Sequence, residues 1–297
     1  MQVYYSDPFG FPLPPGHAFP LVKYALLRER IERWPAATGV QPLLAPRVAR
    51  DELERVHDAG YLDAFAAGRL DAEHMRRIGF PWSEALVERT WRSCGGTVAA
   101  ARAALRDGAA VHLAGGTHHA RRDRGAGYCV VNDVAVAARV VQREAGIGRV
   151  LVVDTDVHQG DGTAAIFAGD DSVFTFSIHG EQNFPAAKAQ SDLDIALPSG
   201  TGDDEYLARL EAGLAVAFAR AQPGFVCWLS GADPFAGDRF GRLRLGKAGL
   251  AERDRRVTAA IRAHGVPSVT VMGGGYARDV TDTVDVYEAT VRAVVGP

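Results

Sequence analysis

The sequence predicts an α/β fold: a single open, doubly wound, mainly parallel sheet with helices on both faces. Two patterns support this prediction. Short apolar runs without polar alternation recur from residue 110 onward, and segments with helical spacing separate them. Strands buried on both faces have such continuous apolar runs, and their alternation with helices is typical of a parallel sheet. Because no linker, charge block or fixed-period repeat divides the chain, we expect one domain over residues 1–297.

Each predicted strand is a short apolar run, and each predicted helix has apolar residues at intervals of three and four. The predicted strands are Gln2–Tyr5, Ala110–Ala114, Val150–Asp154, Val173–Ile178, Phe225–Ser230 and Ser268–Met272. The predicted helices are Pro20–Arg33, Arg50–His57, Tyr61–Ala67, Ser83–Arg106, Asn132–Glu144, Thr163–Phe167, Asp203–Arg220, Gly249–His264 and Asp279–Val294. We expect Cys94–Gly96 to interrupt the fourth of these helices, and Asn132 and Asp279 to act as N-caps.

The composition is that of an ordinary globular protein. The hydrophobic fraction is 47% and the charged fraction 23%, which excludes a disordered chain. The net charge of −3 argues against a nucleic-acid coat protein, which would be basic. Three scattered cysteines form no disulfide framework, and the sequence has neither a secretory leader nor a run of 18 apolar residues. We therefore expect a cytoplasmic protein that binds neither nucleic acid nor a membrane.

Glycine-rich or polar segments follow four of the predicted strands. These segments are Gly115–His119, Asp154–Gly162, Gly231–Asp233 and Gly273–Tyr276. In open α/β sheets, ligands bind beyond the carboxyl ends of the strands. The four segments are therefore expected to converge on one edge of the sheet and to form the functional site.

Asp156, His158 and Asp233 are candidate metal ligands. Asp156 and His158 share one face if their segment is extended, and Asp233 follows a separate strand. Two carboxylates and an imidazole suit Zn²⁺ or Fe²⁺. Three protein ligands leave positions open for water and substrate, as in catalytic sites. The same Asp-x-Asp-x-His segment is also compatible with a strand-end turn whose carboxylates cap the backbone.

His118 and His119 are candidate proton-transfer residues, because Asp154 and Asp161 remain to orient them as two His–Asp dyads. A pair of loop histidines with only structural hydrogen bonds is the alternative. Tyr276 follows three glycines, and its phenol could polarise a carbonyl oxygen. A packed aromatic side chain after a turn is the alternative for this residue.

Five segments together carry a family resemblance. They are Gly115–Ala120, Gly127–Asp133, Asp154–Gly162, Gly231–Asp233 with Gly237–Asp238, and Gly273–Tyr276. With them, the chain from Val3 to Val294 resembles the metal-dependent histone deacetylases, which have the arginase/deacetylase fold. The segments Pro14–Pro20 and Arg77–Trp82 look like those of bacterial and class IV members.

The resemblance implies a role for each motif residue. Asp156, His158 and Asp233 match the zinc ligands. His118, backed by Asp154, and His119, backed by Asp161, match the catalytic histidines, and Tyr276 matches the tyrosine that polarises the scissile carbonyl.

The resemblance also implies an acyl tunnel and a potassium site. Substrate-binding positions are Gly127, Tyr128, Phe184 and Gly274, and the groups expected to hold a structural K⁺ belong to Asp154, Asp156, His158, Ser177 and Ile178. One departure concerns the rim of the tunnel, where the family usually has Pro-Gly-Thr-Gly and this chain has Pro185–Lys188.

We therefore expect a zinc-dependent amidohydrolase that removes acetyl or longer acyl groups from lysine side chains or related acylated amines. An acetylpolyamine or small-molecule amide deacetylase is an alternative. An arginase-like ureohydrolase needs a second metal ion, and Gly160 and Phe235 offer no ligand at the relevant positions. An inactive acyl-lysine binding module is a further alternative, which the complete set of candidate catalytic residues disfavours.

Overall fold

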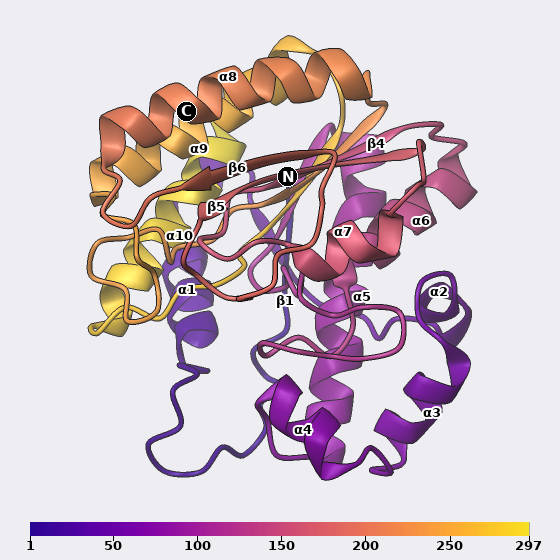
Figure 1. Ribbon diagram of the computed structural model, residues 1–297. Helices are drawn as coiled ribbons and strands as arrows, with labels where there is room; N and C mark the ends of the chain where they lie inside the picture. The colour runs from indigo at the N-terminus through magenta and orange to yellow at the C-terminus, as the bar shows by residue number, and fades with distance from the viewer. Residues whose placement is uncertain (297) are drawn as a thin grey trace.

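The computed structural model describes residues 1–296, and its centre is one sheet of eight parallel strands (Figure 1). The strands are β1 (Gln2–Tyr5), β2 (Gln41–Leu44), β3 (Ala109–His112), β4 (Val150–Asp154), β5 (Val173–Gly180), β6 (Leu193–Leu197), β7 (Phe225–Leu229) and β8 (Ser268–Val271). Their order is β2-β1-β3-β8-β7-β4-β5-β6, and every neighbouring pair is parallel. This confirms the predicted α/β architecture.

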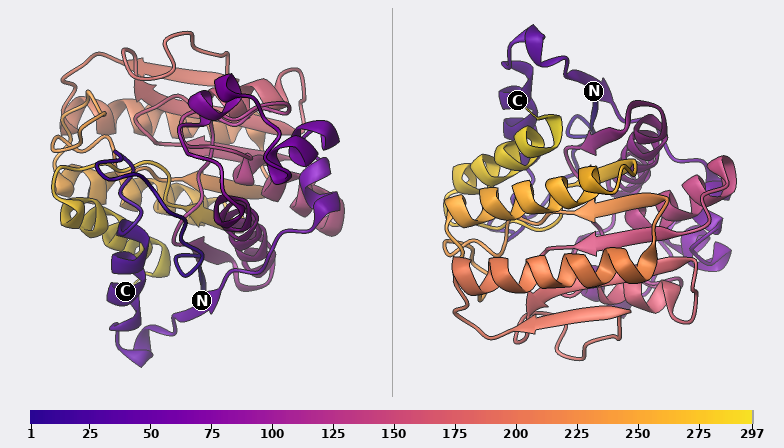
Figure 2. Two further views of the ribbon diagram at one scale, coloured as in Figure 1. Left: turned by 90° about the horizontal axis from the view of Figure 1, so that it is seen from below. Right: turned by 90° about the horizontal axis from the view of Figure 1, so that it is seen from above.

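Helices cover both faces of the sheet (Figures 1 and 2). The helices are α1 (Lys23–Glu32), α2 (Arg50–Glu54), α3 (Ala59–Ala66), α4 (Ala72–Ile78), α5 (Glu84–Asp107), α6 (Asp133–Ala145), α7 (Asp161–Phe167), α8 (Asp203–Ala221), α9 (Lys247–Ala263) and α10 (Val280–Val295), with a 3₁₀ turn at Ala36–Thr38. Figure 1 shows α5, α6 and α7 on one side of the sheet and α8 and α9 on the other. No helix within residues 1–296 has both the length and the apolar character needed to cross a membrane.

Side chains of the central strands alternate between two hydrophobic cores. Val150 and Val152 of β4 belong to the core beneath α5 and α6, whereas Leu151 and Val153 belong to the core beneath α8, α9 and α10. Successive residues of a strand point to opposite faces, so an entirely apolar strand contributes to both cores. This double burial explains why the central strands show no polar alternation.

The strand register brings the four predicted site segments together. His112 pairs with Val271, Val271 with Leu229, and Leu229 with Asp154, so the last residues of β3, β8, β7 and β4 are level with one another. The segments that follow these strands therefore leave the sheet side by side. This confirms the expected convergence at one edge of the sheet.

The expected interruption of the long helix at Cys94–Gly96 is wrong. Helix α5 runs unbroken through these residues, and its glycines allow close packing against neighbouring segments. A Cβ atom at Gly95 would lie 2.1 Å from the carbonyl oxygen of Pro46, and one at Gly96 would lie 2.6 Å from Nε2 of His112. Each glycine lowers the stability of the helix by about 1 kcal/mol relative to alanine, but it allows close contacts that no larger residue permits.

Three elements were not predicted, namely β2, β6 and α4. Both strands lie at the edges of the sheet, where one side lacks a neighbouring strand, and β2 contains Pro42. Strand β6 places exposed Asp194 beside buried Ile195, so it lacks the continuous apolar run of the central strands.

The two predicted N-caps are confirmed, since the side chains of Asn132 and Asp279 accept hydrogen bonds from the N–H groups of Ala135 and Thr281. Most other boundaries differ by one to three residues.

Candidate active site

Asp156, His158 and Asp233 form a compact set of possible metal ligands. Nδ1 of His158 lies 2.9 Å from Oδ1 of Asp156 and 3.1 Å from Oδ2 of Asp233. Within residues 1–296, this is the one group of three such side chains close enough to share an ion. The expectation of an extended segment is wrong, because the backbone bends after β4 and this bend brings Asp156 and His158 together.

The environment of Asp233 fits a bound cation. Its side chain is fully buried, and the nearest donor to Oδ2 is Nδ1 of His158 at 3.1 Å, in a geometry too poor for a regular hydrogen bond. Burial and the charge of Asp156 raise the pKa of Asp233 to about 7. A buried carboxylate oxygen without a donor is costly unless a positive charge compensates it. This poorly satisfied buried oxygen and the donor set of two carboxylates and one imidazole therefore fit a divalent ion such as Zn²⁺.

Backbone groups fix the two carboxylates of this set. The N–H of Gly274 donates to Oδ2 of Asp156 at 2.6 Å, and the N–H of Val157 donates to Oδ1 of Asp233 at 2.9 Å. A Cβ atom at Gly274 would lie 2.0 Å from Oδ2 of Asp233. Position 274 therefore has no room for a side chain, because the glycine backbone itself contacts both carboxylates.

Arg253 on α9 ties the strand ends that carry the ligands. It is fully buried, and its NH1 group donates to the carbonyl oxygens of Ser230 and Gly231 at 2.6 Å each. The same guanidinium pairs with Asp254 at 2.8 Å, and Thr290 donates to the other oxygen of Asp254. A buried charge with these partners holds the loop before Asp233 in a single position.

The two histidines occupy different electrostatic surroundings. Nδ1 of His118 lies 2.7 Å from Asp154, and Nδ1 of His119 lies 2.7 Å from Asp161. Burial lowers the pKa of His118, but the charges of Asp154 and Asp156 outweigh it and raise the value to about 9. Burial and the charge of His118 lower the pKa of His119 to about 4.

Arg121 adds to this difference, because it binds the carboxylate that supports His119. Its NH2 group donates to Oδ2 of Asp161 at 3.1 Å. The positive charge of Arg121 partly neutralises Asp161, which therefore favours protonation of His119 less than Asp154 favours protonation of His118.

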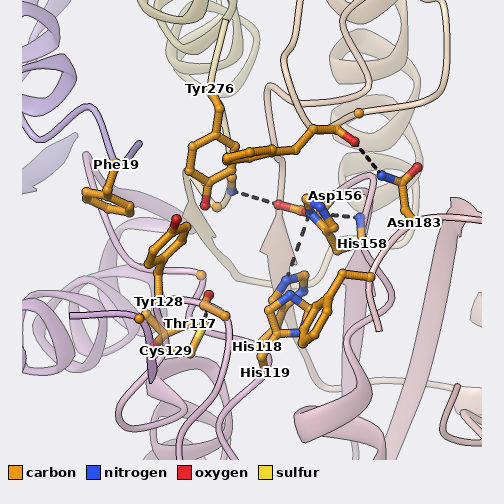
Figure 3. Close-up of a pocket in the computed structure, with 18 of the residues that line it drawn as sticks. Phe19, Thr117, His118, His119, Tyr128, Cys129, Asp156, His158, Asn183 and Tyr276 are labelled. Carbon is orange, nitrogen blue, oxygen red and sulfur yellow. Dashed lines mark hydrogen bonds and ion pairs between the residues drawn. The ribbon is translucent and has the colours of Figure 1, made fainter. Parts of the chain in front are cut away.

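Tyr276 is held at the glycine-rich strand end after β8. Its N–H donates to Asp238 at 2.6 Å, and its carbonyl oxygen accepts from Nε of Arg239 at 3.0 Å. Burial and the carboxylates of Asp233 and Asp156 raise the pKa of its phenol well above 10, so the hydroxyl stays protonated. Figure 3 shows this hydroxyl pointing into the cavity between Tyr128 and Asp156.

Lys23 lies directly behind this tyrosine. Its side chain is fully buried, and Nζ donates to the carbonyl oxygen of Gly275 at 3.0 Å. Nζ also lies 4.9 Å from the centroid of the Tyr276 ring. Burial lowers the pKa of Lys23 to about 8. The sequence contained a signal that Lys23 is buried, since this charged residue lies on the same helix face as the apolar residues Tyr24, Leu27 and Ile31.

The candidate residues share one cavity of about 750 Å³ (Figure 3). Gly127, Tyr128 and Phe184 line it together with His118 and His119. The Phe184 ring lies edge-on to His119 with centroids 4.8 Å apart. The positive φ of 67° at Tyr128 turns this residue toward the cavity, while its N–H donates to Ile78 at the end of α4. The structure thus brings the expected wall residues together.

Comparison with known proteins agrees with this geometry. The model of the histone deacetylase domain matches residues 17–293. The chain belongs to this family.

Several curated proteins are similar to this member of the histone deacetylase domain family. An uncharacterized protein of Picosynechococcus is 42% identical over 98% of this chain and 97% of its own length. The acetoin utilization protein AcuC of Bacillus subtilis is 32% identical over 79% of this chain and 66% of its own length. The histone deacetylase-like amidohydrolase of Pseudomonas aeruginosa is 28% identical over 90% of this chain and 75% of its own length. Membership and these relatives support a hydrolase of the deacetylase or amidohydrolase type.

The expected potassium-binding residues of this family member lie beside the metal ligands. Ser177 of β5 pairs in register with Asp154 of β4, and Ile178 follows it. Oγ of Ser177 also lies 3.0 Å from Nδ1 of His179. The K⁺ site stays a prediction.

Asp238 and Asn183 support the cavity of this family member but were not among the predicted site residues. Asp238 accepts the N–H groups of Phe240, Gly241 and Tyr276. Asn183 donates to the carbonyl oxygen of Phe240 at 2.8 Å, which joins the Phe184 segment to the loop before Tyr276. The Gly-Asp pair at Gly237–Asp238 was a sequence signal that Asp238 belongs to the site. No local pattern indicated Asn183.

Proposed function

We propose that this protein is a metal-dependent deacylase that hydrolyses the amide of acylated lysine side chains or related acylated amines, with Zn²⁺ as its metal ion and Fe²⁺ as the alternative. The observation that carries the proposal is that one cavity is lined by His118, His119, Asp156, His158 and Tyr276, with Asp233 buried directly behind His158. This combination supports hydrolysis over simple binding, because it unites a cation site, a neutral base and a hydrogen-bond donor.

When bound to Asp156, His158 and Asp233, the metal ion would act as a Lewis acid toward an amide carbonyl and a water molecule. His119 is the general base in this proposal. Asp161 holds Nδ1 of His119, and Nε2 makes no hydrogen bond within residues 1–296. Its lowered pKa keeps the imidazole neutral near pH 7, so that Nε2 accepts the proton of the attacking water.

Tyr276 and His118 supply charge stabilisation. The phenol of Tyr276 remains protonated and donates a hydrogen bond to the carbonyl oxygen as negative charge develops on it. His118 is held by Asp154 and provides a positive electrostatic environment next to His119. The water oxygen bonds to the carbonyl carbon, the C–N bond breaks, and the proton taken by His119 passes to the leaving amine. The products are a carboxylate and a free amine.

The experiment that tests this proposal combines metal analysis with turnover. Purified protein loaded with Zn²⁺ or Fe²⁺ is assayed on acyl-lysine peptides of increasing acyl length, on acetylated polyamines and on arginine. We expect hydrolysis of at least one acylated amine, loss of activity with a chelator, and recovery when metal is restored. Release of urea from arginine, or binding without turnover of any acylated amine, would refute the proposal.

A further inference from the structure

Four arginine side chains line the cavity that holds the candidate catalytic residues. Arg76 and Arg77 come from the end of α4, and Arg239 and Arg242 come from the loop between β7 and α9. Among the described residues that line the cavity, the one carboxylate is that of Asp156, which is a candidate metal ligand. The wall of the cavity thus carries an excess of positive charge.

Two of these arginines already have structural partners. Arg77 forms an ion pair with Glu73 one helical turn earlier. Arg239 donates to the carbonyl oxygens of Tyr276 and Ala18, which fixes its guanidinium beside the strand end. Arg77 is thus paired with a carboxylate, and Arg239 is held in place by carbonyl oxygens.

Arg76 and Arg242 have no such partner. Both are exposed, and no carboxylate in residues 1–296 lies within 4.0 Å of either guanidinium. Asp238, the nearest acidic residue in sequence to Arg242, is buried and its oxygens accept the N–H groups of Phe240, Gly241 and Tyr276. The two free guanidinium groups are therefore available to a ligand.

The guanidinium groups of Arg76 and Arg242 are exposed and lie at the mouth of the cavity. The buried part of the cavity lining includes Gly115, Gly116 and Cys129, none of which carries a charge. In an acyl-lysine substrate the scissile carbonyl must reach the metal ligands, so the acyl chain lies on the inner side and the peptide lies at the mouth. A carboxylate on the peptide would meet Arg76 and Arg242, whereas one at the end of the acyl chain would lie away from both guanidinium groups.

We propose that this protein prefers acyl-lysines flanked by acidic residues, and that Arg76 and Arg242 are specificity-determining residues for such peptides. This inference rests on the proposed deacylase function. Guanidinium groups bind carboxylates with directed hydrogen bonds, and a cavity with excess positive charge also attracts acidic ligands at long range. For two exposed ion pairs, we expect about a fivefold gain in kcat/KM over a neutral peptide, within a range of roughly 2- to 30-fold.

The test uses pairs of peptides that differ only in charge. One peptide has Asp on both sides of the acyl-lysine, and its partner has Asn at the same positions. We expect kcat/KM of the wild-type protein to be about fivefold higher for the Asp peptide at 50 mM salt, and this ratio to fall toward one at 500 mM salt because surface ion pairs are screened. In the Arg76→Gln/Arg242→Gln double variant, the ratio should be close to one at both salt concentrations.

A second double variant controls for net charge. Arg143 of α6 and Arg209 of α8 are exposed, line none of this cavity and form no ion pair within residues 1–296. Arg143→Gln/Arg209→Gln removes the same charge, and it should retain the wild-type ratio. Equal loss of the ratio in both double variants would show a general effect of charge and would overturn the inference.

The remaining outcomes separate this inference from the proposed function. Equal kcat/KM for the Asp and Asn peptides at low salt overturns the inference while the deacylase function stands. The same holds if small acylated amines are hydrolysed but neither peptide is. In the Asn peptide, kcat/KM for succinyl-lysine should be no higher than kcat/KM for a lysine with an unbranched neutral acyl group of similar length. A higher kcat/KM for succinyl-lysine, with no effect of the flanking charge, would overturn the inference. If no acylated amine is hydrolysed, the proposed function fails and the inference fails with it.

Discussion

The imidazole rings of His118 and His119 lie with centroids 4.1 Å apart, but their Nδ1 atoms bind carboxylates in different surroundings. Asp154 closes β4 and is itself contacted by the N–H of Asp156, whereas Asp161 begins α7 and is bound by Arg121. Two histidines that share one cavity therefore differ in charge, since the pKa of His118 is raised and that of His119 is lowered. Groups whose pKa values are driven apart in this way commonly take different roles in catalysis.

We predict that His119→Ala is more damaging than His118→Ala. Loss of His119 removes the neutral base and should bring kcat/KM close to background hydrolysis, whereas His118→Ala should retain measurable activity. The measurement is kcat/KM of both variants at matched metal occupancy, because metal loss would mimic a catalytic defect. If His118→Ala proves more damaging at full occupancy, the two roles must be exchanged.

We predict that Tyr276→Phe keeps the fold and the metal ion but lowers kcat by about 10²-fold or more, as expected for loss of a hydrogen-bond donor to the developing oxyanion. Tyr206→Phe is a matched control. Its hydroxyl is buried in α8 without a hydrogen-bond partner in the described residues, and it does not line the cavity. A Tyr276→Phe variant with near-native kcat would remove this residue from the mechanism.

The metal-binding prediction concerns Asp233→Asn. We expect one divalent ion per wild-type chain and much less than one per variant chain. With metal at about 100 times its Kd, the wild-type Tm should rise by roughly 5 °C over the chelated protein, and the variant should show no rise.

The metal-free proteins provide a second readout for this variant. In the absence of metal, Oδ2 of Asp233 lies 3.1 Å from Nδ1 of His158, so Asp233→Asn removes one partner of a buried ion pair and should lower the Tm of the apo protein. Each protein is therefore compared with its own apo form, and a normal metal-dependent rise in the Tm of Asp233→Asn would contradict the assignment of Asp233 as a ligand. Two ions per chain in the wild type would refute the single-site prediction.

The stability of the protein should depend on pH through His57, which lies away from the metal ligands. Nδ1 of His57 lies 2.9 Å from the carbonyl oxygen of Arg121, and Nε2 accepts the N–H of Asn132 at 2.9 Å. Protonation of Nε2 would break the second bond, and burial lowers the pKa of His57 to about 4. Between pH 6.5 and pH 4 the unfolded state binds more protons, so His57 stabilises the fold above this window and loses that effect as pH falls.

The expected size of this effect is about 3 kcal/mol, because each pKa unit corresponds to about 1.4 kcal/mol. Chemical denaturation of the wild type and His57→Gln at several pH values measures it. The stability advantage of the wild type at pH 7.5 should shrink as pH approaches 4. Since the other titrating groups are common to both proteins, a constant difference would contradict the assignment to His57.

We predict that Lys23→Met destabilises the protein by about 1–3 kcal/mol, because the carbonyl oxygen of Gly275 loses a buried donor. Tyr276 follows Gly275, so kcat should fall while the metal content stays near one per chain. Thermal unfolding, metal analysis and kcat are measured together. Unchanged kcat in a destabilised variant would limit Lys23 to a structural role.

The central strands and helix starts could be predicted because their signals are local. Strand β4 was predicted with its observed bounds, since Val150–Val153 form a continuous apolar run. Such a run is typical of a strand that is covered by helices on both faces of the sheet. Asn132 and Asp279 cap helices through hydrogen bonds to residues two or three positions away. The edge strands β2 and β6 escaped prediction because partial exposure weakens the apolar signal. Helix α5 was misread at Gly95, because the close packing against Pro46 is a contact with a distant segment.

The sequence by itself determined the central strands of the sheet, the strand ends that bear the candidate site residues, and Asp156, His158 and Asp233 as a possible ligand set. These features could be read from the sequence because strand burial and motif spacing depend on short segments of the chain. The tertiary structure decided how these groups meet and which charges they experience. Only the register of β3, β8, β7 and β4 sets their ends level, and only packing buries Asp233 with its Oδ2 3.1 Å from Nδ1 of His158. The different charges of His118 and His119 and the free arginines at the mouth likewise depend on neighbours distant in sequence, since an electrostatic environment is set by distance in space.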